Sequence, residues 1–168
     1  MIRLKDQKLV TNRIQPLIGG NFKLGGSVTV DLNLLMVKNQ ISKLSFKAQS
    51  KDLQIPSQSI QSFTLPSIKL NDLNIVANSE NPPRITVDRL FIGDTDSPIR
   101  ANFKGKIELL NGAIAMSPLE LNGELAFSDH FKQSMPLIDM MFQSYTQKDG
   151  FYQLKLGGTL GAPKPMAP

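Results

Sequence analysis

Four segments of this chain alternate apolar and polar residues and place a glycine among the apolar ones; they fall near residues 22–34, 99–109, 119–127 and 152–160. Such alternation puts each apolar set on one face of a β-strand. A glycine inside a strand marks a bend or a close approach of another backbone. The pattern therefore predicts a sheet that curls tightly around its apolar face. The glycines expected at the bends are Gly26, Gly105, Gly123 and Gly158.

The length of 168 residues, with 40% hydrophobic and 20% charged residues, is typical of one globular domain. The absence of cysteine excludes disulfides and thiolate chemistry, and it suits an oxidising periplasm. No apolar run reaches the ~18 residues that a membrane span needs, and the start lacks the apolar core of a signal peptide. We expect either a cytoplasmic protein or a fragment without its export segment. Its single domain covers 1–168, with 1–20 a poorly ordered or edge segment and 161–168 a tail.

Eight to ten strands without βαβ alternation predict an all-β domain, a mainly antiparallel and strongly curved sheet or half-open roll. Leu70 and Leu73 alternate with a one-residue slip between them, which predicts a β-bulge at Asn71–Asp72. Asn111–Gly112 predicts a tight hairpin with a returning strand over 113–127. We expect Gly105 and Gly123 to lie opposite each other, or nearly so, after a bulge near Ser117–Pro118.

Between residues 129 and 146, apolar side chains recur at three- and four-residue steps. This spacing predicts one amphipathic helix near the C-terminus. Pro136 suits the first turn of that helix, because the missing N–H would be unpaired there in any case. The helix is expected to close the open end of the sheet, either as part of the core or as a lid that contacts acyl chains or a partner. The lid residues are Ile138, Met141 and Phe142.

Residues that could carry chemistry are sparse. His130 follows Ser128 and Asp129 directly, which is typical of a helix N-cap and not of a catalytic triad. Asp94 and Asp96 are ordinary turn formers, without the further ligands of a calcium loop. Paired glycines lack phosphate-loop spacing. We therefore predict a non-enzyme with no catalytic residue, no metal site and no cofactor.

The net charge of +5 is scattered over the polar phase of the strands, so nucleic acid is not an expected partner. The inward apolar side chains are medium-sized aliphatics with few aromatics, and this composition suits a linear acyl chain or a partner's strand. The predicted groove residues are Val28, Val30, Leu32, Leu34, Ile99, Phe103, Ile107, Leu109, Leu121 and Leu125.

Residues Leu156 to Pro165 read LxGTLxxPxP, which resembles the closing strand of AsmA-like periplasmic domains. Within that group the chain is most similar to type II secretion system protein N (GspN), over about residues 21–165. The resemblance implies an inner-membrane protein with one N-terminal span, absent here, and a periplasmic β domain without catalytic residues. It also implies other secretion-system components or inner-membrane lipid as partners.

Three functions follow from these observations. The first is a periplasmic accessory domain of a type II secretion system, acting through contact with proteins or with the membrane. The second is an AsmA-like groove that binds or transfers lipid. The third is a structural module whose curled face is filled by its own side chains. Copurified phospholipid would distinguish the second from the third.

Overall fold

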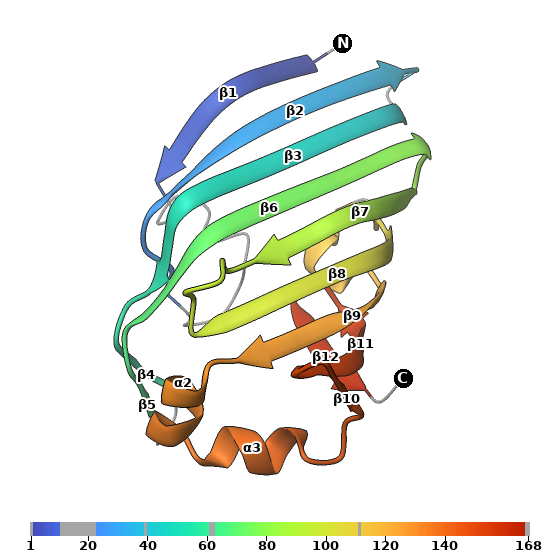
Figure 1. Ribbon diagram of the computed structural model, residues 1–168. Helices are drawn as coiled ribbons and strands as arrows, with labels where there is room; N and C mark the ends of the chain where they lie inside the picture. The colour runs from blue at the N-terminus through green and yellow to red at the C-terminus, as the bar shows by residue number, and fades with distance from the viewer. Residues whose placement is uncertain (1, 11–22, 39, 61–62, 111, 167–168) are drawn as a thin grey trace.

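The computed structural model describes residues 2–10, 23–38, 40–60, 63–110 and 112–166, and its main feature is one open antiparallel sheet (Figure 1). Ten strands form this sheet in the order β1-β2-β3-β6-β7-β8-β9-β11-β10, with β12 paired to β11, while β4 and β5 form a separate hairpin. The predicted all-β, mainly antiparallel fold is thus confirmed. The strands are β1 (Ile2–Val10), β2 (Ser27–Val37), β3 (Gln40–Ile55), β4 (Gln58–Ile60), β5 (Phe63–Leu65), β6 (Ile68–Asn81), β7 (Arg84–Ile92), β8 (Ile99–Glu108), β9 (Leu119–Phe127), β10 (Gln147–Lys148), β11 (Phe151–Thr159) and β12 (Ala162–Met166).

The sheet curves from β1 to β9 and then turns back at β11 and β12, so that its inner face surrounds the core (Figure 1). Alternation along the strands sets the two faces: Ala101 and Phe103 are buried, while Asn102 and Lys104, which follow each of them in turn, are exposed. The pairing of β3 with β6 shifts twice around Leu53, first with an extra residue in β3 and then with an extra residue, Leu70, in β6. Opposite that residue lies Asn71, with φ of 55°, so the predicted slip in the alternation is confirmed.

Gly105 and Gly123 are near neighbours on adjacent strands. Gly105 pairs with Leu121, and Gly123 pairs with Phe103, so the two glycines are offset by two residues in an uninterrupted β8–β9 register. A Cβ on Gly123 would collide with the backbone and ring of Phe103, and one on Gly105 would collide with the β9 backbone at Glu120. These glycines therefore admit the neighbouring strand and leave no free space beside the backbone.

The prediction of a tight hairpin at Asn111–Gly112 is wrong for the residues that follow the turn, which do not return directly as a strand. Asn111 lies outside the described residues, but Ile114–Met116 form a short 3-10 helix, η1, and β9 begins only at Leu119. The bulge expected near Ser117–Pro118 is also absent from the β8–β9 ladder. The reason is Ser117, which is completely buried and whose Oγ accepts the N–H of Leu110 at 2.9 Å, closing a wider loop.

Gly26 lies outside the strand to which its alternation assigned it. It occupies a bend just before β2, with φ of 99°, a left-handed conformation that glycine adopts without steric cost. Gly158 lies within β11, opposite Pro163 of β12. Three of the four predicted bend glycines, Gly105, Gly123 and Gly158, therefore lie in paired strands, and Gly26 does not.

The C-terminal helical region contains two short helices instead of one, α2 (Asp129–Ser134) and α3 (Leu137–Phe142). The Oγ of Ser128 accepts the N–H of Phe131 at 3.2 Å and caps α2, as predicted for this segment. The break falls at Met135–Pro136, because a proline cannot donate the hydrogen bond that would continue α2. Pro136 is instead the N-cap of α3.

The chain ends differ from expectation in one respect. Residues Ala162–Met166, expected to belong to a tail, form β12 along β11. Prolines 163 and 165 are tolerated there because β12 is an edge strand. At the other end Ile2–Val10 forms the edge strand β1, within the segment expected to be poorly ordered or an edge; residues 11–20 and 167–168 lie outside the described part of the chain.

Candidate functional site: an apolar groove

A cavity of about 750 Å³ lies on the inner face of the curled sheet, and every side chain that lines it is apolar. Proteins normally pack their interiors with few voids larger than a water molecule. A cavity of this size lies within the range of small-molecule sites, which is roughly 300–1,000 Å³. The lining residues are Leu9, Leu24, Val28, Val30, Phe46, Ala48, Leu53, Ile55, Leu70, Leu73, Ile75, Leu90, Ile92, Ile99, Ala101, Phe103, Leu125, Phe142, Leu154, Leu156 and Pro165. We call this cavity the groove.

The wall of the groove is built by strand alternation. Strands β2, β3, β6, β7, β8, β9 and β11 each contribute one or more inward side chains. In β2 these are Val28 and Val30, while Thr29 between them is exposed. Because neighbouring strands are hydrogen-bonded across this stretch, the wall is continuous and offers no backbone donor or acceptor to a ligand. It therefore suits an apolar ligand and gives no basis for acid–base or nucleophilic chemistry.

Two residues of the LxGTLxxPxP segment line the groove. Leu156 of β11 and Pro165 of β12 are direct register partners, and both belong to the lining. The segment thus folds as a hairpin, and each of its two strands contributes one of these residues to the groove wall.

The predicted groove residues divide into two groups. Five line the cavity: Val28, Val30, Ile99, Phe103 and Leu125. The other five lie nearer the β2–β3 and β8–β9 connections and outside the lining: Leu32, Leu34, Ile107, Leu109 and Leu121. Leu121 is buried in the core, and the remaining four are half-buried. The cavity thus occupies the part of the apolar face that lies nearer the helices.

The three predicted lid residues have different roles. Phe142 lines the groove, and its ring packs against Phe127, with centroids 5.3 Å apart. Ile138 packs against the core beside it, outside the lining. Met141 is 69% exposed and takes no part in the groove, since the helix turns it toward solvent. The helix thus closes one end of the groove with Phe142 and leaves the cavity itself unoccupied by Ile138 or Met141.

Sequence reasoning missed the contribution of β3 and β6. Leu53 and Ile55 of β3 and Leu70, Leu73 and Ile75 of β6 all line the groove. The bulges interrupt alternation at this point, so these residues do not form one regular period-two series. The slip that separates Leu70 from Leu73 was the available signal, because it marks where the strand bends around the cavity.

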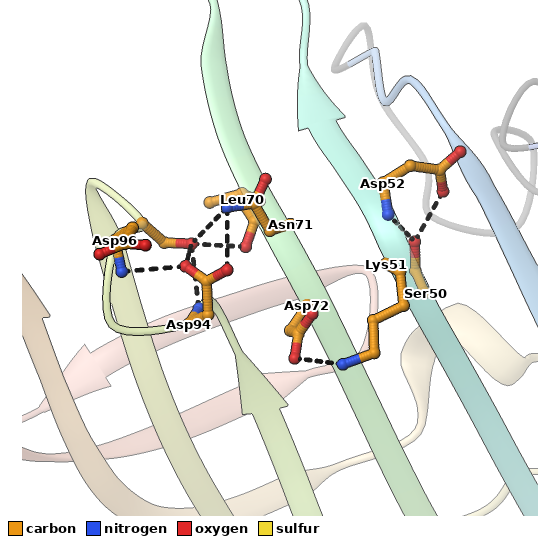
Figure 2. A network of polar contacts seen from close by, with 9 residues as sticks. Ser50, Lys51, Asp52, Leu70, Asn71, Asp72, Asp94 and Asp96 are labelled. Carbon is orange, nitrogen blue, oxygen red and sulfur yellow. Dashed lines mark hydrogen bonds and ion pairs between the residues drawn. The ribbon is translucent and has the colours of Figure 1, made fainter.

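A polar network links β6 to the loop between β7 and β8 beside the bulges (Figure 2). The hydroxyl of Ser97, only 2% exposed, lies 2.8 Å from the carbonyl oxygen of Leu70 and 2.7 Å from Oδ1 of Asp94. The Asp94 carboxylate also accepts the Nδ2–H of Asn71 at 3.0 Å and the N–H of Asp96 at 3.1 Å. These bonds hold the pKa of Asp94 below its ordinary value, and the bond from the Ser97 hydroxyl has the largest effect. Asp94 and Asp96 thus act as turn residues, as the sequence indicates.

A second carboxylate, Asp52, ties the start of β2 to the bulge of β3. Its Oδ1 accepts the N–H of Ser27 at 3.0 Å, and the hydroxyls of Ser27 and Ser50 lie 3.1 Å from it. The bond from the Ser27 N–H is the main reason why the pKa of Asp52 is lowered. Lys51 and Asp72 form an ion pair at 2.7 Å between β3 and β6 (Figure 2). The carboxylates of this region therefore have structural partners.

Within the described ranges, no group of three or more histidine, cysteine or acidic side chains is placed to hold a metal ion. The helices that the structure describes are too short and too polar to cross a bilayer. No family model, curated protein or solved structure matches the chain.

Proposed function

We propose that this chain is a non-enzymatic domain that binds the acyl chain of a lipid in the groove. The all-apolar lining of a cavity of about 750 Å³ supports this proposal. An acyl chain has no polar group that needs a partner inside the cavity, and its removal from water is favourable in proportion to the apolar area covered. A polar ligand would lose its hydrogen bonds with water without replacement.

The filled-core alternative requires side chains of the helix to occupy the concave face. Of the three residues predicted to do so, only Phe142 reaches the cavity, while Met141 is 69% exposed. The two central glycines do not enlarge the cavity either, because the neighbouring strand lies against them. The size of the cavity therefore follows from the curl of the sheet, which favours a binding groove over a structural module.

The resemblance to AsmA-like domains gives this proposal its cellular setting. A groove of this kind fits a periplasmic domain anchored in the inner membrane by an N-terminal span, with inner-membrane lipid as the ligand. The position of Leu156 and Pro165 in the groove wall supports this connection, since both belong to the segment that carries the resemblance.

Mass spectrometry of an organic extract of the purified domain tests the proposal directly. We expect fatty acid or phospholipid at close to one molecule per chain. Ala48 is 3% exposed and lines the groove, so Ala48→Phe places a ring in the cavity and should lower the lipid content several-fold. A wild-type extract without lipid, together with no uptake of added fatty acid, would leave the filled-core reading.

The absence of tryptophan permits a second measurement, because one introduced indole reports on a single site. Phe103 lines the groove, whereas Phe91, between Leu90 and Ile92, lies on the opposite face of β7. Brominated acyl chains should quench Phe103→Trp strongly and its matched control Phe91→Trp weakly. Phe142→Trp is a second reporter with more room, should the larger ring disturb the core at 103. Equal quenching at 103 and 91 would contradict binding in the groove.

A role in a type II secretion system is the second candidate, favoured by the edge strand β1. Among the described strands β1 pairs only with β2, so its outer edge is available for a strand of another protein. Lys5→Pro should weaken binding to purified periplasmic domains of inner-membrane secretion components at least tenfold and leave the lipid content unchanged. Failure of the wild type to bind any of them in a biosensor assay would remove this role.

A further inference from the structure

Among the described residues, eight of the twelve exposed large hydrophobic side chains lie at one end of the sheet. The antiparallel strand order brings the β2–β3, β6–β7, β8–β9 and β11–β12 connections to this end, which we call the turn end. In Figure 1 the β2–β3 and β6–β7 turns mark it at the right of the view. Its exposed hydrophobic residues are Ile2, Leu35, Met36, Val37, Leu110, Ile114, Met116 and Leu160.

The β8–β9 loop is the most apolar part of the turn end. Residues 109–118 contain no charge. The short helix η1 within them has no buried residue, and Ile114 and Met116 are 59% and 62% exposed. The loop is nevertheless well anchored, because the buried Ser117 accepts one N–H through its side chain, and its carbonyl accepts the N–H of Leu160 at 3.0 Å. A fixed backbone thus holds two large apolar side chains in water.

The inner apolar face continues from the groove to the turn end. In β2, Val28 and Val30 line the groove, and Leu32 and Leu34 follow on the same face. Leu34 pairs with Leu44 of β3, and both are half-buried. An acyl chain that moves along this face meets aliphatic side chains from the groove to the turns.

The turn end also carries an excess of positive charge. Six cations lie within about four residues of its connections or at the start of β1, against three carboxylates. The cations are Arg3, Lys38, Lys43, Arg84, Lys106 and Lys164, and the carboxylates are Glu80, Glu108 and Glu120. Lys38 directly follows the exposed Val37 at the tip of the β2–β3 turn. Cations placed beside apolar tips complement a membrane surface with anionic headgroups.

We infer that the turn end docks on a lipid bilayer and that the lipid enters and leaves the groove there. This inference rests on the proposed lipid-binding function and names the source of the ligand. The bilayer is the occupant because apolar tips on separate turns, with cations between them, can insert one by one below the headgroups. A second copy of the chain would need one contiguous surface, since stable protein interfaces bury roughly 1,200–2,000 Å².

Flotation with vesicles tests the docking surface. The wild-type chain should float with vesicles of 30% phosphatidylglycerol in phosphatidylcholine and several-fold less with phosphatidylcholine alone. The double variant Ile114→Asp/Met116→Asp should reduce flotation at least tenfold. The matched control is Met140→Asp/Met141→Asp on α3, whose residues are 63% and 69% exposed, outside the groove lining and away from the turn end. It should float like the wild type.

Three results would overturn the inference: no flotation of the wild type, loss of flotation in the α3 variant instead of the loop variant, or sedimentation velocity showing a dimer that only the loop variant dissociates. Both variants are expected to fold, because the substituted side chains are exposed, and thermal melts check this. Lipid content is measured in parallel and should not change, because neither pair lines the groove. Lipid present without flotation refutes the docking surface alone, whereas flotation without lipid refutes the groove function alone.

Discussion

The clearest stability prediction concerns Phe142, which joins α3 to the sheet. Its ring packs edge-on against Phe127 at 5.3 Å and lies 5.3 Å from Tyr145 and 5.5 Å from Tyr152. Truncation of a buried phenylalanine to alanine costs about 3–5 kcal/mol. Phe142 is half-buried, so we expect Phe142→Ala to lower the free energy of unfolding by about 2–4 kcal/mol. At about 2–4 °C per kcal/mol for a chain of this size, Tm should fall by roughly 5–15 °C.

Guanidinium unfolding of the purified variants measures this difference. Met141→Ala is the matched control: it changes the adjacent residue of the same helix, but the side chain is 69% exposed. We expect its free energy of unfolding to stay within about 0.5 kcal/mol of the wild type. Equal stabilities for the two variants, both near wild type, would refute the packing argument and make α3 a loosely attached lid.

Three further predictions concern the polar network and the sheet bend. Hydrogen bonds to the charged carboxylates lower the pKa of Asp52 and of Asp94, so both groups stabilise the fold above their ordinary pKa of about 4. This stabilisation is lost as the pH falls through that value toward the lowered pKa values. Denaturant midpoints measured between pH 6 and pH 2 should therefore decrease, and a variant with both aspartates changed to asparagine should show a smaller decrease. Ser97→Ala removes the hydroxyl that bonds the buried carbonyl oxygen of Leu70, and it should lower the free energy of unfolding in urea by about 1–3 kcal/mol. A urea midpoint equal to that of the wild type would contradict this expectation. Gly123→Ala forces a Cβ against Phe103 and the β8 backbone, so we expect thermal melting to show a destabilisation of about 1–3 kcal/mol. An unchanged stability would show that β8 and β9 do not approach closely at this point.

Local patterns in the sequence were enough to predict the elements that depend on near neighbours. Period-two alternation identified β8 and β9 because each residue's face is set by its position in an extended chain. The slip near Asn71 located a bulge, since one extra residue shifts the alternation wherever it occurs. Ser128 marked the start of α2 through a bond that spans three residues.

Only the tertiary structure decided the features that depend on distant residues. The 109–118 loop replaced a tight hairpin because the buried Ser117 and the β11–β12 turn hold it open. Ala162–Met166 became a strand because β11 offered a free edge, on which prolines are tolerated. The groove occupies the helix-side part of the apolar face because α3 and the β11–β12 hairpin converge there. Alternation specifies which residues face inward, but the position of a cavity depends on which other segments fold over that face.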